Sequence, residues 1–173
     1  MFAVLVTGPP GAGKTATLIA LLDALAEHHV PHAGVDVDEV AWAYPFPNLA
    51  QRCEHLRAWS VSHVRAGATL LVVAEVIESR AHLADVLVAL GVDDHLLVRL
   101  EAEQATLRER IIAREPDGWF GLDHLLDDMA NLHATMPALE GVHLVVDTER
   151  LTTAQIADAI RAARPDRLAA PMA

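Results

Sequence analysis

The chain has 173 residues and a formal net charge of −11, from 13 basic and 24 acidic side chains. Such an acidic surface repels nucleic acid and anionic lipid, so we expect neither as a partner. Apolar residues make up 53% of the chain and aromatic residues only 4%. This composition favours packed helices and buried parallel strands over an aromatic-rich β-sandwich.

Apolar runs alternate with helical patterns along the chain. The predicted strands are 2–6, 32–37, 69–76, 95–100 and 142–146. The predicted helices are 14–28, 48–65, 80–90, 102–114, 122–136 and 152–163. Asn48, Ser79 and Thr152 are the expected N-caps, and Gly91 is expected to end the helix over 80–90.

Five strands separated by helices predict right-handed βαβ units, hence an α/β fold with a parallel sheet and helices on both faces. We expect one domain over residues 1–165 and a loose tail over 166–173. In such sheets, ligands bind at the carboxyl ends of the strands.

The stretch after the first strand carries Gly8, four residues, then Gly13, Lys14 and Thr15. This is the G-x-x-x-x-G-K-[ST] phosphate loop, in the strand–loop–helix context that it requires. Backbone N–H groups and the helix N-terminus would hold phosphate oxygens, Lys14 would reach the β- and γ-phosphates, and the Thr15 hydroxyl would hold Mg²⁺. The predicted nucleotide-binding residues are Gly8, Gly11, Ala12, Gly13, Lys14, Thr15 and Ala16.

Two acids, Asp36 and Asp38, follow the second strand. In an extended segment both side chains would point to one side, where one could bind Mg²⁺ through water and the other accept a hydroxyl proton. The alternative is an acidic turn that caps the helix after it. We assign Asp36 as a metal-side and catalytic residue, and Asp38 as a catalytic and substrate-binding residue.

Arg108, Arg110 and Arg114 crowd one predicted helix, and the last two share a face. The segment after them, EPDGWFG, has the composition of a short closing lid over about 114–121. Arginines entering on a lid can stabilise a transferred phosphoryl group, so Arg110 and Arg114 are catalytic candidates. The alternative is a solvated face paired with Glu109 and Glu115.

Further candidates lie near the acid pair. Trp42, Tyr44 and Phe46 either wall a substrate pocket or pack under the next helix. Arg57 and Arg80 are candidate ligands for a substrate anion, although either could be a surface residue. Tyr44, Arg57, Glu75 and Arg80 complete the predicted substrate-binding set with Asp38.

These motifs resemble the small P-loop kinases typified by shikimate, gluconate and adenylylsulfate kinases. The resemblance is carried by GPPGAGKT, the DVD after the second strand, RIIAR before a short lid, and DTERLTTAQIADAI. GVD at Gly34–Asp36 is also similar to chloramphenicol phosphotransferase. The resemblance implies a three-layer P-loop NTPase fold, ATP and Mg²⁺, and transfer of phosphate to a small-molecule hydroxyl.

By position, the resemblance places Asp147 and Thr148 near the adenine and makes Arg110 or Arg114 the lid arginine. The chain departs from the family at Ala74-Glu75-Val76, which lacks a Gly-rich turn, and Glu75 is a candidate for the metal-side acid. We expect a sugar acid, a nucleoside or an antibiotic-like acceptor. The alternatives are a nucleoside monophosphate kinase, an ATPase switch acting through a protein partner, or a protein that binds nucleotide without turnover.

The remaining features are less specific. The single cysteine, Cys53, excludes an internal disulfide, fits a reducing cytoplasm, and is expected in the core. We expect the protein to be a monomer or a homodimer. The ten histidines show no metal-ligand spacing, so we predict no histidine metal site. No apolar run has the ~18 residues of a membrane span, and no signal peptide is expected.

Overall fold

The computed structural model describes residues 1–40 and 43–168. Five parallel strands form one sheet in the order β2-β3-β1-β4-β5. They are β1 (Phe2–Thr7), β2 (His32–Asp36), β3 (Leu70–Ala74), β4 (Asp94–Glu101) and β5 (Leu144–Asp147). The predicted α/β class and five-stranded parallel sheet are therefore confirmed.

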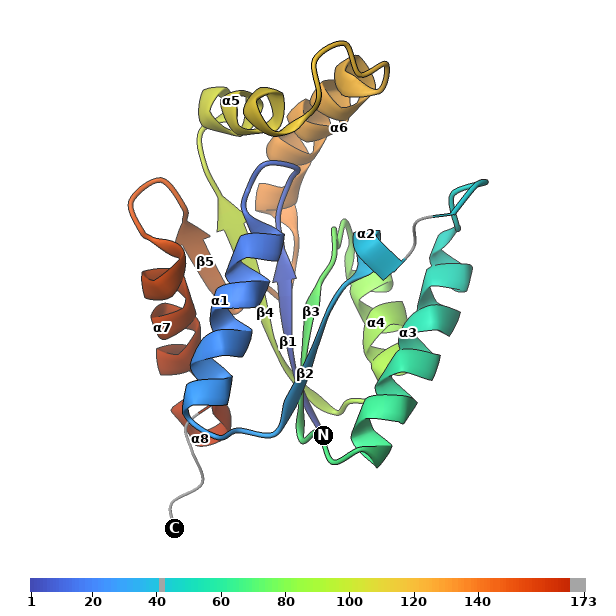
Figure 1. The fold of residues 1–173 in the computed structure, drawn as a ribbon, viewed down its shortest axis with the longest axis vertical. Helices are drawn as coiled ribbons and strands as arrows, with labels where there is room; N and C mark the ends of the chain where they lie inside the picture. Colours follow the sequence, from blue (N-terminus) through green and yellow to red (C-terminus); the bar gives the residue numbers. More distant parts are fainter. Residues whose placement is uncertain (41–42, 169–173) are drawn as a thin grey trace.

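Helices cover both faces of the sheet, as Figure 1 shows. One face carries α1 (Lys14–Glu27) and α7 (Thr153–Ala163), and the other carries α3 (Leu49–Arg65) and α4 (Arg80–Leu90). Beyond the carboxyl end of the sheet stand α5 (Gln104–Arg114) and α6 (Leu122–Thr135), joined by the predicted lid segment (Figure 1). Three one-turn elements complete the described chain: α2 (Val37–Val40), η1 (Met136–Ala138) and α8 (Pro165–Leu168).

The central strand β1 is apolar from Phe2 to Val6, and burial on both faces of the sheet explains this run. Phe2, Val4 and Val6 belong to the core cluster on one face of the sheet, whereas Ala3 and Leu5 belong to the cluster on the other. Successive side chains of a strand point to opposite faces, so a strand covered by helices on both sides must be apolar at every position.

The predicted helix caps are confirmed. Asn48 and Thr152 each accept a hydrogen bond from the backbone N–H three residues on, within reciprocal capping boxes. Ser79 accepts a hydrogen bond from the N–H of His82, and Gly91 ends α4 with φ 68°, a left-handed conformation that favours glycine.

The structure differs from the prediction at the C-terminal end. Residues 166–168 are not loose, because α8 continues the packing there: Leu168 is fully buried, and Arg164 makes two hydrogen bonds to the Asp94 carboxylate at 3.1 and 2.9 Å. The rest of the predicted tail, 169–173, lies outside the described residues. Cys53 is half-buried at the edge of the core rather than within it.

The topology determines where a ligand can bind. Strand β1 lies between β3 and β4, and the helices that follow β1 and β3, namely α1 and α4, lie on opposite faces of the sheet. A crevice therefore opens beyond the carboxyl ends of these two strands. Among the described residues, no helix is both long enough and apolar enough to cross a membrane.

Candidate active site

The loop from Gly8 to Gly13 joins β1 to α1 in a conformation that only glycine allows at two points. Gly8 has φ 154° and Gly11 has φ 82°. A Cβ atom on Gly8 would lie 2.7 Å from the carbonyl oxygen of Leu100, and one on Gly11 would lie 2.7 Å from that of Leu107. The loop can therefore approach β4 and α5 this closely only because these two residues lack a Cβ atom.

Helix α1 begins directly after this loop, with Gly13 as a left-handed N-cap. The N–H of Thr17 donates to the carbonyl of Gly13 at 2.9 Å, as the start of the helical hydrogen-bond pattern. The N–H groups of Lys14, Thr15 and Ala16 precede it, so they have no acceptor within the helix. All three residues line a cleft, and their free donors at a helix N-terminus suit phosphate oxygens.

Lys14 supplies the cation of this loop. Its Nζ donates to the carbonyl oxygen of Gly8 at 3.0 Å. Burial lowers the pKa of Lys14, while the negative charges of Asp38, Asp36 and Glu75 act in the opposite direction. The ammonium is thus surrounded by carboxylates from the neighbouring strand ends.

Thr15 contacts the first of the predicted acids. Its Oγ1 donates to Oδ2 of Asp36 at 2.5 Å. Asp36 is the last residue of β2, and its side chain is buried, with 7% of the residue exposed. A hydroxyl and a carboxylate side by side are the hard oxygen donors that Mg²⁺ prefers, so this pair fits the metal that the motif implies.

The acid pair is not extended, contrary to the prediction. Helix α2 begins at Val37, so Asp36 lies at the end of a strand and Asp38 lies in a helical turn. The Oδ1 of Asp36 accepts the N–H of Asp38 at 3.2 Å, which caps this turn, as the alternative interpretation proposed. Both acids nevertheless line the same cleft, Asp36 as a buried residue and Asp38 as an exposed one.

The cleft has a volume of about 670 Å³. Its loop side, as we call it, consists of Gly11, Gly13, Lys14, Thr15, Ala16, Arg110 and Arg114. Its acid side consists of Asp36, Asp38 and Val76. Pro10, Glu115 and Leu125 complete the lining. The structure therefore brings together the phosphate loop, both acids and two of the three arginines of α5.

Arg110 connects the lid helix to the phosphate loop. Its guanidinium donates to Oγ1 and to the carbonyl oxygen of Thr148, at 2.9 and 3.0 Å, and to the carbonyl oxygen of Gly11 at 3.3 Å. Arg114 lies at the same cleft, where it forms an ion pair with Glu115 at 2.6 Å. Arg108 is exposed and outside the lining.

Beside the cleft, a smaller cavity of about 250 Å³ lies between the loop and the segment after β5. Ala12, Arg110 and Thr148 line it. Asp147 faces elsewhere: its carboxylate pairs with Arg150 at 3.0 Å and lines a separate cavity. Of the two residues expected near an adenine, Thr148 is placed next to the loop and Asp147 is not.

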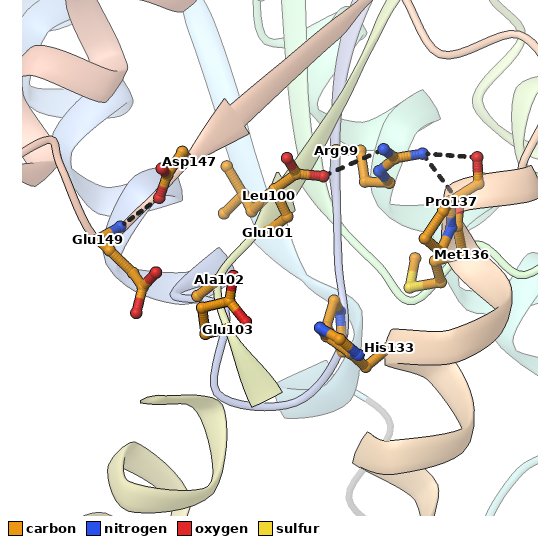
Figure 2. Close-up of a pocket in the computed structure, with 11 residues that line it drawn as sticks. Arg99, Leu100, Glu101, Ala102, Glu103, His133, Met136, Pro137, Asp147 and Glu149 are labelled. Atoms are coloured by element: carbon orange, nitrogen blue, oxygen red, sulfur yellow. Dashed lines mark hydrogen bonds and ion pairs between the residues drawn. The ribbon is translucent and has the colours of Figure 1, made fainter. Parts of the chain in front are cut away.

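That separate cavity, of about 280 Å³, lies at the ends of β4 and β5 and is shown in Figure 2. Arg99 there donates to the carboxylate of Glu101 at 3.1 Å and to the carbonyl oxygens of Met136 and Pro137 at 3.0 and 3.2 Å (Figure 2). Only Pro9 of the phosphate loop reaches this cavity.

Glu75, directly after β3, lies behind the acid side. Only 1% of the residue is exposed, and its Oε1 accepts a hydrogen bond from Nη1 of Arg52 at 2.8 Å. Burial raises the pKa of Glu75 to about 7, and Arg52 partly offsets this effect. Arg52 thus has its charge matched by a buried carboxylate.

The two arginines expected to bind a substrate anion are not in the lining of the cleft. Arg57 is exposed on α3, and Arg80 is 83% exposed and 3.6 Å from Glu140. Arg52 takes the inward position because it shares a helical face with the buried Leu56, four residues on. That periodicity was the signal that distinguishes Arg52 from Arg57.

The predicted aromatic wall is also outside the lining. Tyr44 is fully exposed, and Phe46 is 61% exposed, with its ring 6.0 Å from the guanidinium carbon of Arg52. Trp42 lies outside the described residues. On the lid, Phe120 is 97% exposed.

Neither a protein-family model nor a curated protein sequence matches this chain. Solved structures do match it over nearly its whole length. A sugar kinase from Janibacter sp. HTCC2649 superposes with a TM-score of 0.68 at 17% identity, covering 96% of this chain and 95% of its own. An APS kinase from Mycobacterium tuberculosis, in complex with AMPPNP and APS, gives 0.66 at 20% identity, with 94% and 96% covered.

A gluconokinase from Sinorhizobium meliloti 1021 gives a TM-score of 0.61 at 19% identity, covering 96% of this chain and 93% of its own. The resemblance drawn from the sequence is confirmed at the level of the fold. The chain therefore shares its fold, a parallel sheet with helices on both faces, with solved structures of small-molecule kinases.

Proposed function

We propose that the protein is a phosphotransferase that moves the γ-phosphate of ATP to a hydroxyl group of a small molecule, with Mg²⁺. The observation that carries this proposal is the Thr15–Asp36 hydrogen bond of 2.5 Å, because it places the acid pair opposite the phosphate loop within one cleft. ATP is supported as the donor by the motif and by the AMPPNP bound in the APS kinase of the same fold.

In this proposal the loop side holds the donor. The free N–H groups of residues 14–16, Lys14 and Arg110 would bind phosphate oxygens, and Thr15 with Asp36 would hold Mg²⁺, which neutralises charge on the phosphates. The cavity beside Thr148 would receive the base. Positioning and electrostatic stabilisation then supply most of the rate.

The acid side would hold the acceptor. A bond forms between the acceptor oxygen and the γ-phosphorus as the bond from that phosphorus to the bridging oxygen of ADP breaks, and the hydroxyl proton passes to a carboxylate. Both oxygens of Asp36 already accept hydrogen bonds, from Thr15 and Asp38. We therefore assign the general base to Asp38 and the metal side to Asp36.

A screen for ADP release tests this function. Hydroxylated metabolites and antibiotics are added one at a time with Mg²⁺-ATP, and Lys14→Ala serves as the inactive control. Acceptor-dependent ADP release by the wild-type protein alone is the expected result. ATP hydrolysis that no small alcohol changes, but that a protein stimulates, would replace this proposal with an ATPase switch.

A further inference from the structure

The positive charges of the chain can be accounted for completely, because all 13 lysines and arginines belong to the described residues. Three of them, Lys14, Arg110 and Arg114, lie on the loop side. Arg52 is bound to Glu75. The other nine lie outside the lining of the cleft: Arg57, Arg65, Arg80, Arg99, Arg108, Arg150, Arg161, Arg164 and Arg167.

The acid side itself contains no cationic side chain, and the charge of the Mg²⁺ proposed at Asp36 would be shared by that carboxylate and the ATP phosphates. Asp36 and Asp38 line it, and Glu75 lies directly behind Val76. The side chain of Arg52, on the neighbouring helix α3, is only 16% exposed and forms an ion pair with Glu75 at 2.8 Å. Burial also lowers the pKa of His82, which lies near Arg52, so this histidine adds no positive charge at neutral pH.

The lid does not supply a cation to this side either. Arg114, the last arginine before the lid, forms its ion pair with Glu115, and Glu115 also lines the cleft. Helix α6, which follows the lid, contains the acids Asp123, Asp127 and Asp128 but no lysine or arginine. Of α6, Leu125 is the residue in the lining of the cleft, so the lid segment and this helix add no unmatched positive charge there.

Asp38 has no direct ion-pair or hydrogen-bond partner for its carboxylate among the described residues, although the ammonium of Lys14 is close enough to interact with its charge. This carboxylate is exposed to the cleft. An anionic acceptor at this position would face like charges, which disfavours binding, whereas a cation would be attracted. The transferred phosphoryl group adds further negative charge at the same place.

We infer that the acceptor is a hydroxyl compound that also carries a protonated amine, of the amino sugar or amino alcohol class, and is not a carboxylate or a phosphate ester. This inference rests on the proposed phosphotransferase function and specifies the charge of its acceptor. It excludes the sugar acids and the nucleoside monophosphates that the sequence had left open, because both bring an anion to the acid side.

Acceptors that share a carbon skeleton and differ in charge test the inference. D-Glucosamine, D-glucose and D-gluconate form one such set, and a library of hydroxylated compounds is sorted into amines, neutral compounds and acids. We expect kcat/KM to be higher for the amines by about 10-fold or more than for their acid counterparts. An acid or neutral compound used as well as its amine counterpart would overturn the inference.

The two proposals fail in different ways. If no class of compound stimulates ADP release although ATP binds, the phosphotransferase function is rejected, and the acceptor class with it. If acids are the preferred acceptors, the function stands and only the acceptor class is rejected.

Variants test the cause. At pH 8, above the pKa of about 7 of Glu75, Glu75→Gln removes the charge that matches Arg52, so the preference for amines over acids should fall by about 10-fold. Glu78→Gln, a change of the same type at an exposed position outside the lining, should leave that preference within about 2-fold of wild type. If Glu75→Gln does not fold, Val76→Lys adds a cation to the acid side directly, with Val76→Met as its uncharged control. An unchanged preference in the folded charge variant would contradict the account.

Discussion

The hydroxyl of Thr15 lies 2.5 Å from Oδ2 of Asp36, so the first turn of α1 and the end of β2 meet at one point. Twenty-one residues separate the two in the sequence. The contact follows from the parallel sheet, because the carboxyl ends of β1 and β2 lie at the same edge although β3 separates the two strands. It joins the phosphate loop to the acid pair.

Removing the Thr15 hydroxyl should weaken Mg²⁺ binding, so that activity requires more Mg²⁺. We expect Thr15→Val, which keeps the shape of the side chain, to raise the Mg²⁺ concentration for half-maximal activity by about 10-fold or more. Thr15→Ser retains the hydroxyl and should stay close to wild type. A Mg²⁺ titration of ADP release measures both, and equal titration curves for Val and Ser would contradict the role given to Thr15.

Replacing Asp36 or Asp38 by asparagine should lower kcat in two different ways. Asp38→Asn should lower kcat by roughly 10²-fold or more at any Mg²⁺ concentration, the scale of a lost general base. Asp36→Asn should be partly restored by raising Mg²⁺, because that residue lies beside Thr15. Near-normal kcat in Asp38→Asn would move the base to Asp36 or Glu75.

Arg110 should be the arginine that matters on α5. Its bonds to Thr148 and Gly11 hold it at the cleft, so Arg110→Met should lower kcat by about 10²-fold, as the loss of a transition-state donor does. Arg108→Met, on the same helix but exposed, should change kcat by less than about 2-fold. Equal losses in the two variants would show that the helix, rather than Arg110, is responsible.

Glu75 should make folding stability depend on pH. Burial raises its pKa from an ordinary value of 4.5 to about 7, so the folded protein holds a proton that the unfolded chain has lost between these values. The free energy of unfolding should therefore fall as the pH rises from about 4.5 to 7, by at most about 3 kcal/mol.

Denaturant unfolding of wild type and Glu75→Gln at pH 5 and pH 8 measures this effect. Wild type should lose stability relative to the variant as the pH rises, since glutamine does not titrate. Parallel behaviour of the two proteins would mean that Glu75 stays ionised throughout, held by Arg52.

Features written locally in the sequence could be predicted. The caps at Asn48 and Thr152 depend on side chains three residues away, and the loop from Gly8 to Thr15 depends on consecutive residues. The strands were recognisable because continuous apolar runs are what a sheet covered on both faces requires. Element order then led to the sheet and to its ligand-binding edge.

Features that depend on tertiary contact could not be predicted as well. Helix α2 has four residues, too few to show a period, so the different environments of Asp36 and Asp38 were not visible. The packing of the chain after Pro165 could not be foreseen, because Asp94, the partner of Arg164 and Arg167, lies far away in the sequence. The choice of Arg52 over Arg57, by contrast, could have been made from the sequence, because Arg52 shares a helical face with the apolar Leu56 four residues on.

Direct detection of the product tests the central claim that phosphate moves from ATP to a hydroxyl at the Lys14–Asp38 cleft. Phosphorus NMR of the wild-type protein with Mg²⁺-ATP and its best amine acceptor should show one phosphomonoester formed for each ADP released, and none with Lys14→Ala. ADP appearing only with inorganic phosphate, or a phosphomonoester formed equally by Lys14→Ala, would contradict the account.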